Sequence, residues 1–241
     1  MRVLGIDTST SVASCAVAVA GDGGIDVIAS LDRGIASHSD DLLVIIDEVL
    51  KAAALTVTKL DAVCVGTGPG SFTGLRIGMA TAKGLAFAAG VPLWTASSLA
   101  ALAADARAVA PAATEIVALM DARRGEVFCG VFAIEGQRVV AKTPEDTRSP
   151  ADLAGVVTAP LATVAVVGEG AARYPEAARA VGFLPPGART GASGAAVVEI
   201  AWAGDRKDTL MTATPTYIRP ADAERKFPNG NPGGTFSPAP S

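Results

Sequence analysis

Residues 66–76 read Gly-Thr-Gly-Pro-Gly-Ser-Phe-Thr-Gly-Leu-Arg, and they join a short apolar segment, 62–65, to a run of small residues, 72–89. We predict a strand before this stretch and a helix after it, because glycine-rich turns often connect the two. Such a turn can direct backbone N–H groups at an anion. The stretch lacks the ending of a P-loop and the spacing of a dinucleotide-binding turn. A phosphate cradle and a tightly packed β-to-α turn are therefore both open interpretations.

Strands dominate the residues that precede this turn. Apolar or alternating segments predict strands over 3–7, 14–20 and 25–31, and helical spacing of apolar residues predicts a helix over 40–53. After the glycine-rich helix, a strand from residue 91 and a helix over 99–109 are expected. A meander followed by alternating helices and strands is typical of a mixed sheet covered by helices.

The second half repeats this pattern in a shorter form. Predicted strands cover 116–121, 127–134, 138–142 and 163–168, and a predicted helix covers 194–203. We expect an N-terminal lobe over 1–110 and a smaller C-terminal lobe over 111–221. Proline, glycine, asparagine and serine dominate 222–241, which predicts a disordered tail.

The overall composition limits the functional classes. The 241 residues are 50% hydrophobic and carry a formal net charge of -4, whereas a protein that grips nucleic acid alone normally has a basic excess. The three cysteines are far apart, which predicts buried thiols rather than a zinc site. We find neither a signal peptide nor a membrane-spanning stretch in the sequence, and we expect a cytoplasmic protein.

Six short motifs resemble the TsaB family, also called YeaZ. They are Gly5–Thr10, His38–Ser39, Gly68–Gly78, Ala82–Ala86, Asp121–Val127 and Pro215–Pro220. The resemblance implies an α/β fold of the actin/hexokinase/Hsp70 (ASKHA) class, with two related lobes built on mixed sheets. It also implies a role in making threonylcarbamoyladenosine on tRNA, beside a catalytic TsaD-like transferase and a TsaE-like ATPase. On this basis tRNA is met only through the complex, and the chain can also pair with a second copy.

The same resemblance favours an accessory subunit over a catalyst. TsaD-like transferases hold a metal with two histidines four residues apart, and the matching positions here are Ser98 and Leu102. The chain has a single histidine, His38, so no such pair can form. We therefore expect no catalytic residue and no metal site. A glycoprotease is the least favoured alternative, because a Ser-His-Asp system would depend on His38 without a recognisable nucleophile turn.

A remnant of a nucleotide site is the second expectation. In the ASKHA class, an aspartate at the end of the first strand and the hydroxyl residues after it handle metal-bound phosphates. The candidate residues are Asp7, Thr8, Ser9, Gly68, Gly70 and Ser71. We find no convincing second phosphate loop, so we expect at most weak binding of ATP or ADP and no resident cofactor. An ATP-dependent phospho- or carbamoyl-transferase stays the main alternative function, and Asp7 as a purely structural strand-end residue is a further one.

Two helices are predicted to meet the partner. Glycine and alanine recur every four residues in the helix over 72–89, and the helix over 40–53 has a wide apolar face. The candidate interface residues are Leu42, Ile46, Val49, Gly74, Leu75, Gly78 and Ala82. The competing interpretation is that these residues belong to the core of their own lobe.

Overall fold

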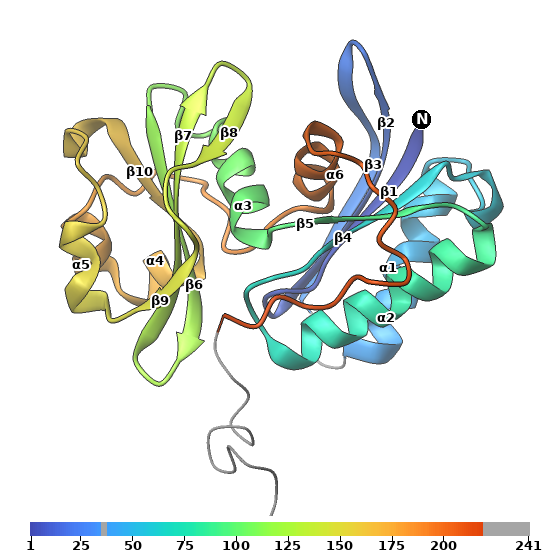
Figure 1. The fold of residues 1–241 in the computed structure, drawn as a ribbon, viewed down its shortest axis with the longest axis horizontal. Coiled ribbons are helices and arrows are strands. Elements are labelled where there is room, and N and C mark those ends of the chain that lie inside the picture. The colour runs from blue at the N-terminus through green and yellow to red at the C-terminus, as the bar shows by residue number, and fades with distance from the viewer. Residues whose placement is uncertain (35–37, 219–241) are drawn as a thin grey trace, which may run out of the picture.

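Two five-stranded sheets form the frame of the molecule in the computed structural model, which describes residues 1–34 and 38–218 (Figure 1). The first sheet has the strand order β3-β2-β1-β4-β5. Its strands are β1 (Arg2–Asp7), β2 (Val12–Gly21), β3 (Gly24–Gly34), β4 (Ala62–Gly66) and β5 (Leu93–Ala96). Strands β1 to β3 pair antiparallel, and β4 and β5 continue the sheet in parallel from β1.

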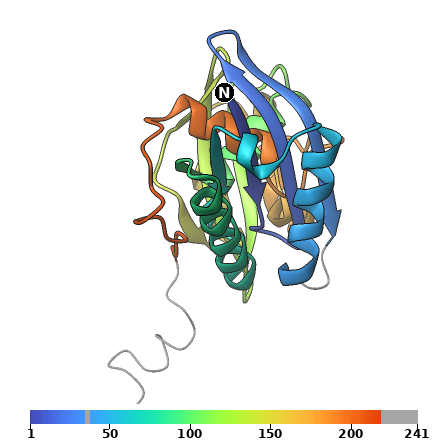
Figure 2. The ribbon, with the colours of Figure 1, turned by 90° about the vertical axis from the view of Figure 1, so that its right-hand side faces the viewer.

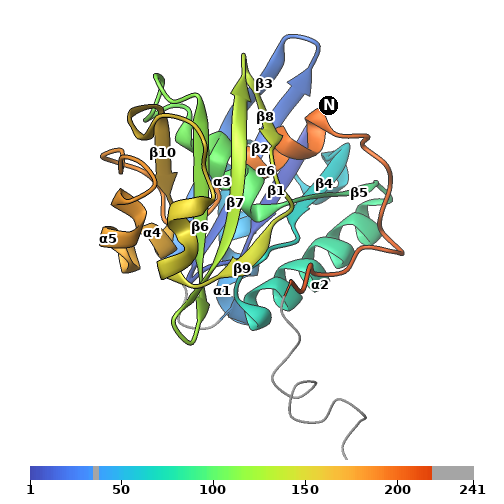
Figure 3. The same ribbon diagram turned by 60° about the vertical axis from the view of Figure 1, so that its left-hand side comes forward.

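The second sheet repeats the start of this topology (Figure 3). Its strands are β6 (Glu115–Arg123), β7 (Glu126–Glu135), β8 (Arg138–Ala141), β9 (Asp146–Arg148) and β10 (Val164–Val167). Strands β6 to β8 form an antiparallel meander, and β10 lies parallel to β6 just as β4 lies parallel to β1. The predicted α/β class with two related, mixed sheets is confirmed.

The helices form three layers around the two sheets (Figure 1). They are α1 (His38–Ala52), α2 (Phe72–Ala89), α3 (Ser98–Ala106), α4 (Glu169–Arg173), α5 (Pro175–Arg179) and α6 (Gly194–Ala203). Helices α1 and α2 pack on the outer face of the first sheet, α3 and α6 lie between the sheets, and α4 and α5 cover the second sheet. Strand β1 shows why the first sheet is covered on both faces. Its Leu4 and Ile6 point to the layer of α1 and α2, and its Val3 points to the layer of α3 and α6.

The chain returns to the first sheet after it has built the second. Helix α6 packs against the first sheet, although it falls within the range 111–221 predicted for the C-terminal lobe. Residues 205–218 then run along β5 and α2, where the Thr209 N–H donates to Leu93 O at 2.8 Å (Figure 2). The chain passes from the first sheet to the second between β5 and β6, and the two lobe ranges stay a prediction. The predicted tail, 222–241, lies outside the described residues.

Most of the predicted helices and strands are present, and the structure adds short elements that the sequence did not predict. The helix over 72–89 and the helix over 194–203 have the predicted bounds. Sequence patterns did not reveal β9, α4 and α5, which have three to five residues each and are too short for periodicity to identify. Within the described ranges, no helix has both the length and the apolar character needed to cross a membrane.

Candidate functional site

The candidate site begins at the carboxyl end of β1. Asp7 ends this strand, and its side chain lies against Gly66, the last residue of the parallel neighbour β4. A Cβ atom at Gly66 would lie 2.0 Å from Asp7 Oδ2, so any larger residue would displace the carboxylate. The glycine is therefore needed for close approach, and the carboxylate sits between the ends of two parallel strands.

Serine side chains and one backbone amide satisfy this carboxylate. Oδ1 accepts from Ser9 N at 2.9 Å and from Ser9 Oγ at 2.5 Å, and Oδ2 accepts from Ser98 Oγ at 2.6 Å. Asp7 is only 1% exposed. Burial raises the pKa of its carboxyl above the ordinary value, although the hydrogen bonds from Ser9 and Ser98 act in the opposite direction.

The loop after Asp7 and the glycine-rich turn before α2 are joined directly to each other. Ser71 N donates to Ser9 O at 2.7 Å, and a Cβ atom at Gly70 would lie 2.3 Å from that same oxygen. Thr8 Oγ1 donates to Gly74 O at 2.8 Å, in the first turn of α2. The Ser71 hydroxyl caps α2 by accepting from Gly74 N at 3.3 Å.

The structure thus brings the six predicted nucleotide residues together, but they form hydrogen bonds with one another and with Gly74 and Ser98. They are Asp7, Thr8, Ser9, Gly68, Gly70 and Ser71. Gly68 belongs to the same arrangement, since its N–H donates to Ser98 Oγ at 3.1 Å. A nucleotide phosphate would have to compete with these internal hydrogen bonds, and nucleotide binding stays a prediction.

The positions matched to the metal-binding histidine pair lie on α3. Ser98 and Leu102 are both buried, and the Ser98 hydroxyl is committed to Asp7 and Gly68. Among the described residues, no group of three His, Cys, Asp or Glu side chains is placed to hold a metal ion. In this part of α3 a hydroxyl network and a packed leucine occupy the positions of the two histidines.

The residues predicted for the partner surface pack inside the first lobe. Leu42, Leu75 and Ala82 are at most 1% exposed, and Ile46 and Val49 are 2% exposed. Gly74 and Gly78 are buried as well, and a Cβ atom at Gly78 would lie 2.2 Å from Thr8 Oγ1. These seven residues are therefore buried in the isolated chain, and their contact with a partner stays a prediction.

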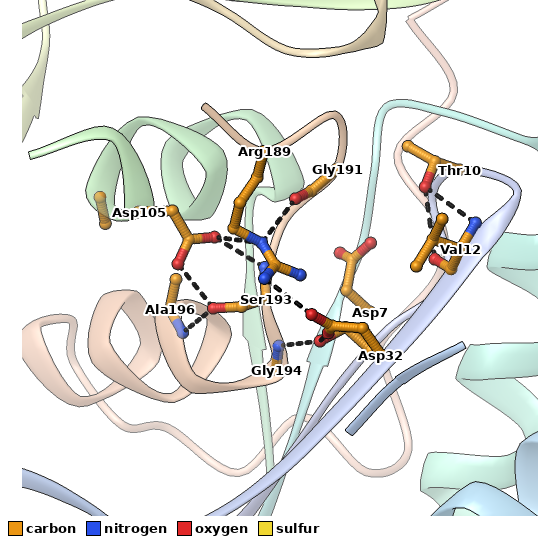
Figure 4. A network of polar contacts seen from close by, with 12 residues as sticks. Asp7, Thr10, Val12, Asp32, Asp105, Arg189, Gly191, Ser193, Gly194 and Ala196 are labelled. Carbon is orange, nitrogen blue, oxygen red and sulfur yellow. Dashed lines mark hydrogen bonds and ion pairs between the residues drawn. The ribbon is translucent and has the colours of Figure 1, made fainter. Parts of the chain in front are cut away.

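A second polar network, which the sequence did not reveal, lies near Asp7 (Figure 4). Arg189 Nη1 pairs with Asp32 Oδ2 at 2.8 Å, and Arg189 Nε lies 3.5 Å from Asp105 Oδ2. Asp105 also accepts from the backbone and the hydroxyl of Ser193, both at 2.7 Å. Burial raises the pKa of Asp105, although Ser193 acts in the opposite direction.

This network connects elements that are distant in the sequence. Asp32 lies on β3, Asp105 on α3, and Arg189 on the segment that leads to α6. A small cavity of about 250 Å³ lies beside Arg189. Only the serine that precedes α6 carries a local signal, because serine is a preferred N-cap and Ser193 Oγ accepts from Ala196 N at 3.0 Å.

Comparison with known proteins identifies the family. The family model for TsaD, tRNA N6-adenosine threonylcarbamoyltransferase, matches residues 33–220. TsaB of Bacillus subtilis, a tRNA threonylcarbamoyladenosine biosynthesis protein, is 27% identical over 233 residues, which cover 94% of this chain and 98% of that protein. The chain belongs to this family, in its TsaB/YeaZ branch. The predicted resemblance is confirmed.

Further TsaB/YeaZ relatives agree with this assignment. TsaB of Escherichia coli is 38% identical over 128 residues, which cover 53% of each chain. The chain thus spans about half the length of this relative, and the same holds for TsaB of Haemophilus influenzae, at 52%. The solved structure of YeaZ from Pseudomonas aeruginosa has a TM-score of 0.75 and 28% identity, and it covers 90% of this chain and 99% of that one. This structural likeness extends over both sheets.

Proposed function

We propose that this protein is a non-catalytic partner subunit of a TsaD-like transferase in the threonylcarbamoylation of tRNA adenosine. The TsaB/YeaZ relatives support the pathway. One structural observation supports the role of partner subunit, namely the apolar side chains that two neighbouring helices expose. Helix α1 exposes Leu43 (55%) and Val44 (49%), and helix α2 exposes Phe72 (40%) and Phe87 (78%). The two helices contact each other on one side of the first sheet (Figure 2). Exposed apolar side chains on neighbouring helices are typical of a protein-binding surface.

The accessory role also rests on the chemistry of α3. Ser98 and Leu102 stand where a metal-binding transferase has histidines, and the sequence has a single histidine. We expect elemental analysis of the purified protein to find no bound zinc or iron. About one metal per chain, lost in His38→Ala, would contradict this role.

Further partners follow from the same assignment. A TsaE-like ATPase would join the assembled complex, and a second copy of the chain is an alternative occupant of the same helices. With a net charge of -4, the protein would meet tRNA through the complex rather than alone. We also expect the protein to act in the cytoplasm.

The decisive experiment mixes this protein with its cognate TsaD-like transferase and measures the mass of the complex and the transfer activity. Val44→Glu puts a charge on the exposed face of α1, so it should stay folded and bind the transferase at least about tenfold more weakly. Val27→Glu makes the same change at a 43% exposed position on β3 and serves as the control. Equal binding by wild type, Val44→Glu and Val27→Glu would contradict the proposed surface.

An ATP-dependent transferase of the same fold is the second candidate, because the loop after Asp7 lies against the glycine-rich turn before α2. The hydrogen bonds within these loops lead us to expect that any ATP binding is weaker than about 100 μM, or roughly 5.5 kcal/mol. Calorimetry with wild type and Asp7→Ala tests this expectation. Low-micromolar binding that Asp7→Ala removes would favour the enzyme. A glycoprotease stays the least supported function, since the only histidine in the sequence is His38.

A further inference from the structure

A cavity of about 590 Å³ lies where the two lobes meet, away from the Asp7 network. The β2–β3 hairpin, the β7–β8 hairpin and the end of α6 line it. Its apolar walls are Ile25, Val139, Ile200 and Trp202, which are partly buried side chains at the edge of the core between the sheets. The volume falls within the range of small-molecule sites, roughly 300–1,000 Å³.

The charged groups at this cavity are unevenly matched. Arg107 and Glu199 satisfy each other at 2.5 Å, and Arg107 also donates to the carbonyls of Ala104 and Gln137. Arg138 is an exposed residue of the cavity lining, and its side chain forms no hydrogen bond or ion pair with the described residues. Because Arg107 and Glu199 neutralise each other, Arg138 is the one charged side chain of the lining without a partner among the described residues.

Trp202 adds a flat apolar surface to this cation. Its ring is half-buried and packs near Trp94, with 6.1 Å between the ring centroids. The guanidinium of Arg206 lies 4.5 Å from the Trp202 ring centroid, which brings a second positive charge to the same region. The cavity therefore combines aliphatic walls, an aromatic side chain and the cation of Arg138, and Arg206 lies outside its lining.

We propose that this cavity binds a small organic anion with a flat, apolar body. The apolar body would pack on Trp202 and the aliphatic walls, and its anionic group would pair with Arg138. This inference does not depend on the proposed role beside a transferase, because the cavity and the exposed face of α1 and α2 share no residue.

The test uses two dyes of similar shape and the full chain. The anionic probe is 1-anilinonaphthalene-8-sulfonate, and the neutral probe is N-phenyl-1-naphthylamine. Dye fluorescence and quenching of tryptophan emission give the affinity of each. We expect one sulfonate dye per chain, bound about tenfold more tightly than the neutral dye, and Arg138→Gln should remove most of that preference. Arg179→Gln, at an exposed arginine on α5, is the charge-matched control.

A blocking variant locates the bound dye. Ala203 is exposed and lines the cavity, so Ala203→Phe should fill space there without disturbing the core, and Ala52→Phe makes the same change at the end of α1. We expect Ala203→Phe to weaken sulfonate binding at least about tenfold and Ala52→Phe to leave it unchanged. An unchanged affinity for the sulfonate dye in Ala203→Phe would overturn the proposal. Equal affinities for the two dyes that Arg138→Gln leaves unchanged would overturn it as well. Circular dichroism of every variant shows that it is folded.

Discussion

The two lobes begin with the same aspartate turn but surround it differently. Asp7 ends β1 and accepts from the N–H two residues later, Ser9, at 2.9 Å, and Asp121 in β6 accepts from Arg123 N at 3.0 Å. In the first lobe, hydroxyl groups complete the shell of a fully buried carboxylate. In the second lobe, the other oxygen of Asp121 faces Arg123 and Arg173 at 3.5 and 3.7 Å.

The difference shows how one backbone pattern serves two purposes. Asp7 is bonded to the start of α3 through Ser98, so it holds separate elements of the first lobe together. The Asp121 side chain is only 7% exposed, but it meets arginine side chains that are 80% and 56% exposed, and charges that stay in water contribute little to stability when they pair. The repeated topology thus fixes the position of each aspartate, and the neighbouring side chains fix what it does.

The largest expected effect comes from the packing of α2 against the loop of the first lobe. Gly78→Leu puts a side chain where Thr8 Oγ1 already lies, so we expect a loss of about 3 kcal/mol or more in the free energy of unfolding. Gly84→Leu is the matched control, because nothing lies within 4 Å of a Cβ atom at that position of the same helix. Urea denaturation gives both values. Similar stability of the two variants would show that the contact with Thr8 is easily rearranged.

The second largest effect is expected for the two aspartates, whose replacement should lower the free energy of unfolding by different amounts. Asp7→Ala leaves the Ser9 and Ser98 hydroxyls without their acceptor inside the protein, which should cost about 2–3 kcal/mol. Asp121→Ala should cost about 1 kcal/mol, because its arginine partners are well exposed. Chemical denaturation of both variants measures the difference. A cost for Asp121→Ala that equals or exceeds the cost for Asp7→Ala would invalidate the comparison.

The pH dependence of stability gives a subtler test of the Asp7 site. Burial raises the pKa of Asp7 in the folded protein, whereas an unfolded aspartate ionises near pH ~4. The folded state therefore holds its proton longer, and this group lowers stability as the pH rises from about 4 through the folded pKa. Asp7→Asn lacks this effect. Its free energy of unfolding should fall less than that of wild type over this range, as measured by urea denaturation.

Asp32 provides a control of opposite sign. Burial acts to raise the pKa of its carboxyl, but hydrogen bonds from Arg189 and Ser14 outweigh it and lower the pKa. Asp32 thus contributes stability above the ordinary aspartate pKa, and this contribution is lost as the pH falls through the folded pKa. Asp32→Asn should be most costly near neutral pH. Parallel pH curves for wild type, Asp7→Asn and Asp32→Asn would contradict both assignments.

The smallest expected difference between the two lobes is in the rate at which their buried cysteines react with a thiol reagent in the native protein. Burial raises the pKa of Cys15 and Cys129 to about 12 and raises the pKa of Cys64 as well. All three thiols should therefore resist a disulfide reagent at neutral pH and react fully in denaturant. Cys129, in the second sheet, should label first, because it is 2% exposed and the other two are 0% exposed. Rapid labelling of Cys15 or Cys64 without unfolding would show that the first lobe opens more readily.

Local patterns were enough to predict the main elements and the loops of the site. Periodicity gave the strands and the long helices, and the Gly66–Arg76 stretch marked the turn onto α2. The strand-end position of Asp7 and the glycine-rich turn predicted which six residues would lie together. These features depend on near neighbours in the chain, so the sequence by itself determined them.

Only the tertiary structure decided what covers each face. An apolar stripe such as Leu42, Ile46 and Val49 shows that a helix face is buried, but the same stripe would suit the lobe's own core or a partner. Packing on the first sheet buried that stripe and left Leu43 and Val44 exposed. The pairing of Arg189 with Asp32, 157 residues away in the chain, likewise forms only when the chain returns to the first sheet. Long-range contacts carry no periodic signal, and they alone set which groups are paired, buried or exposed.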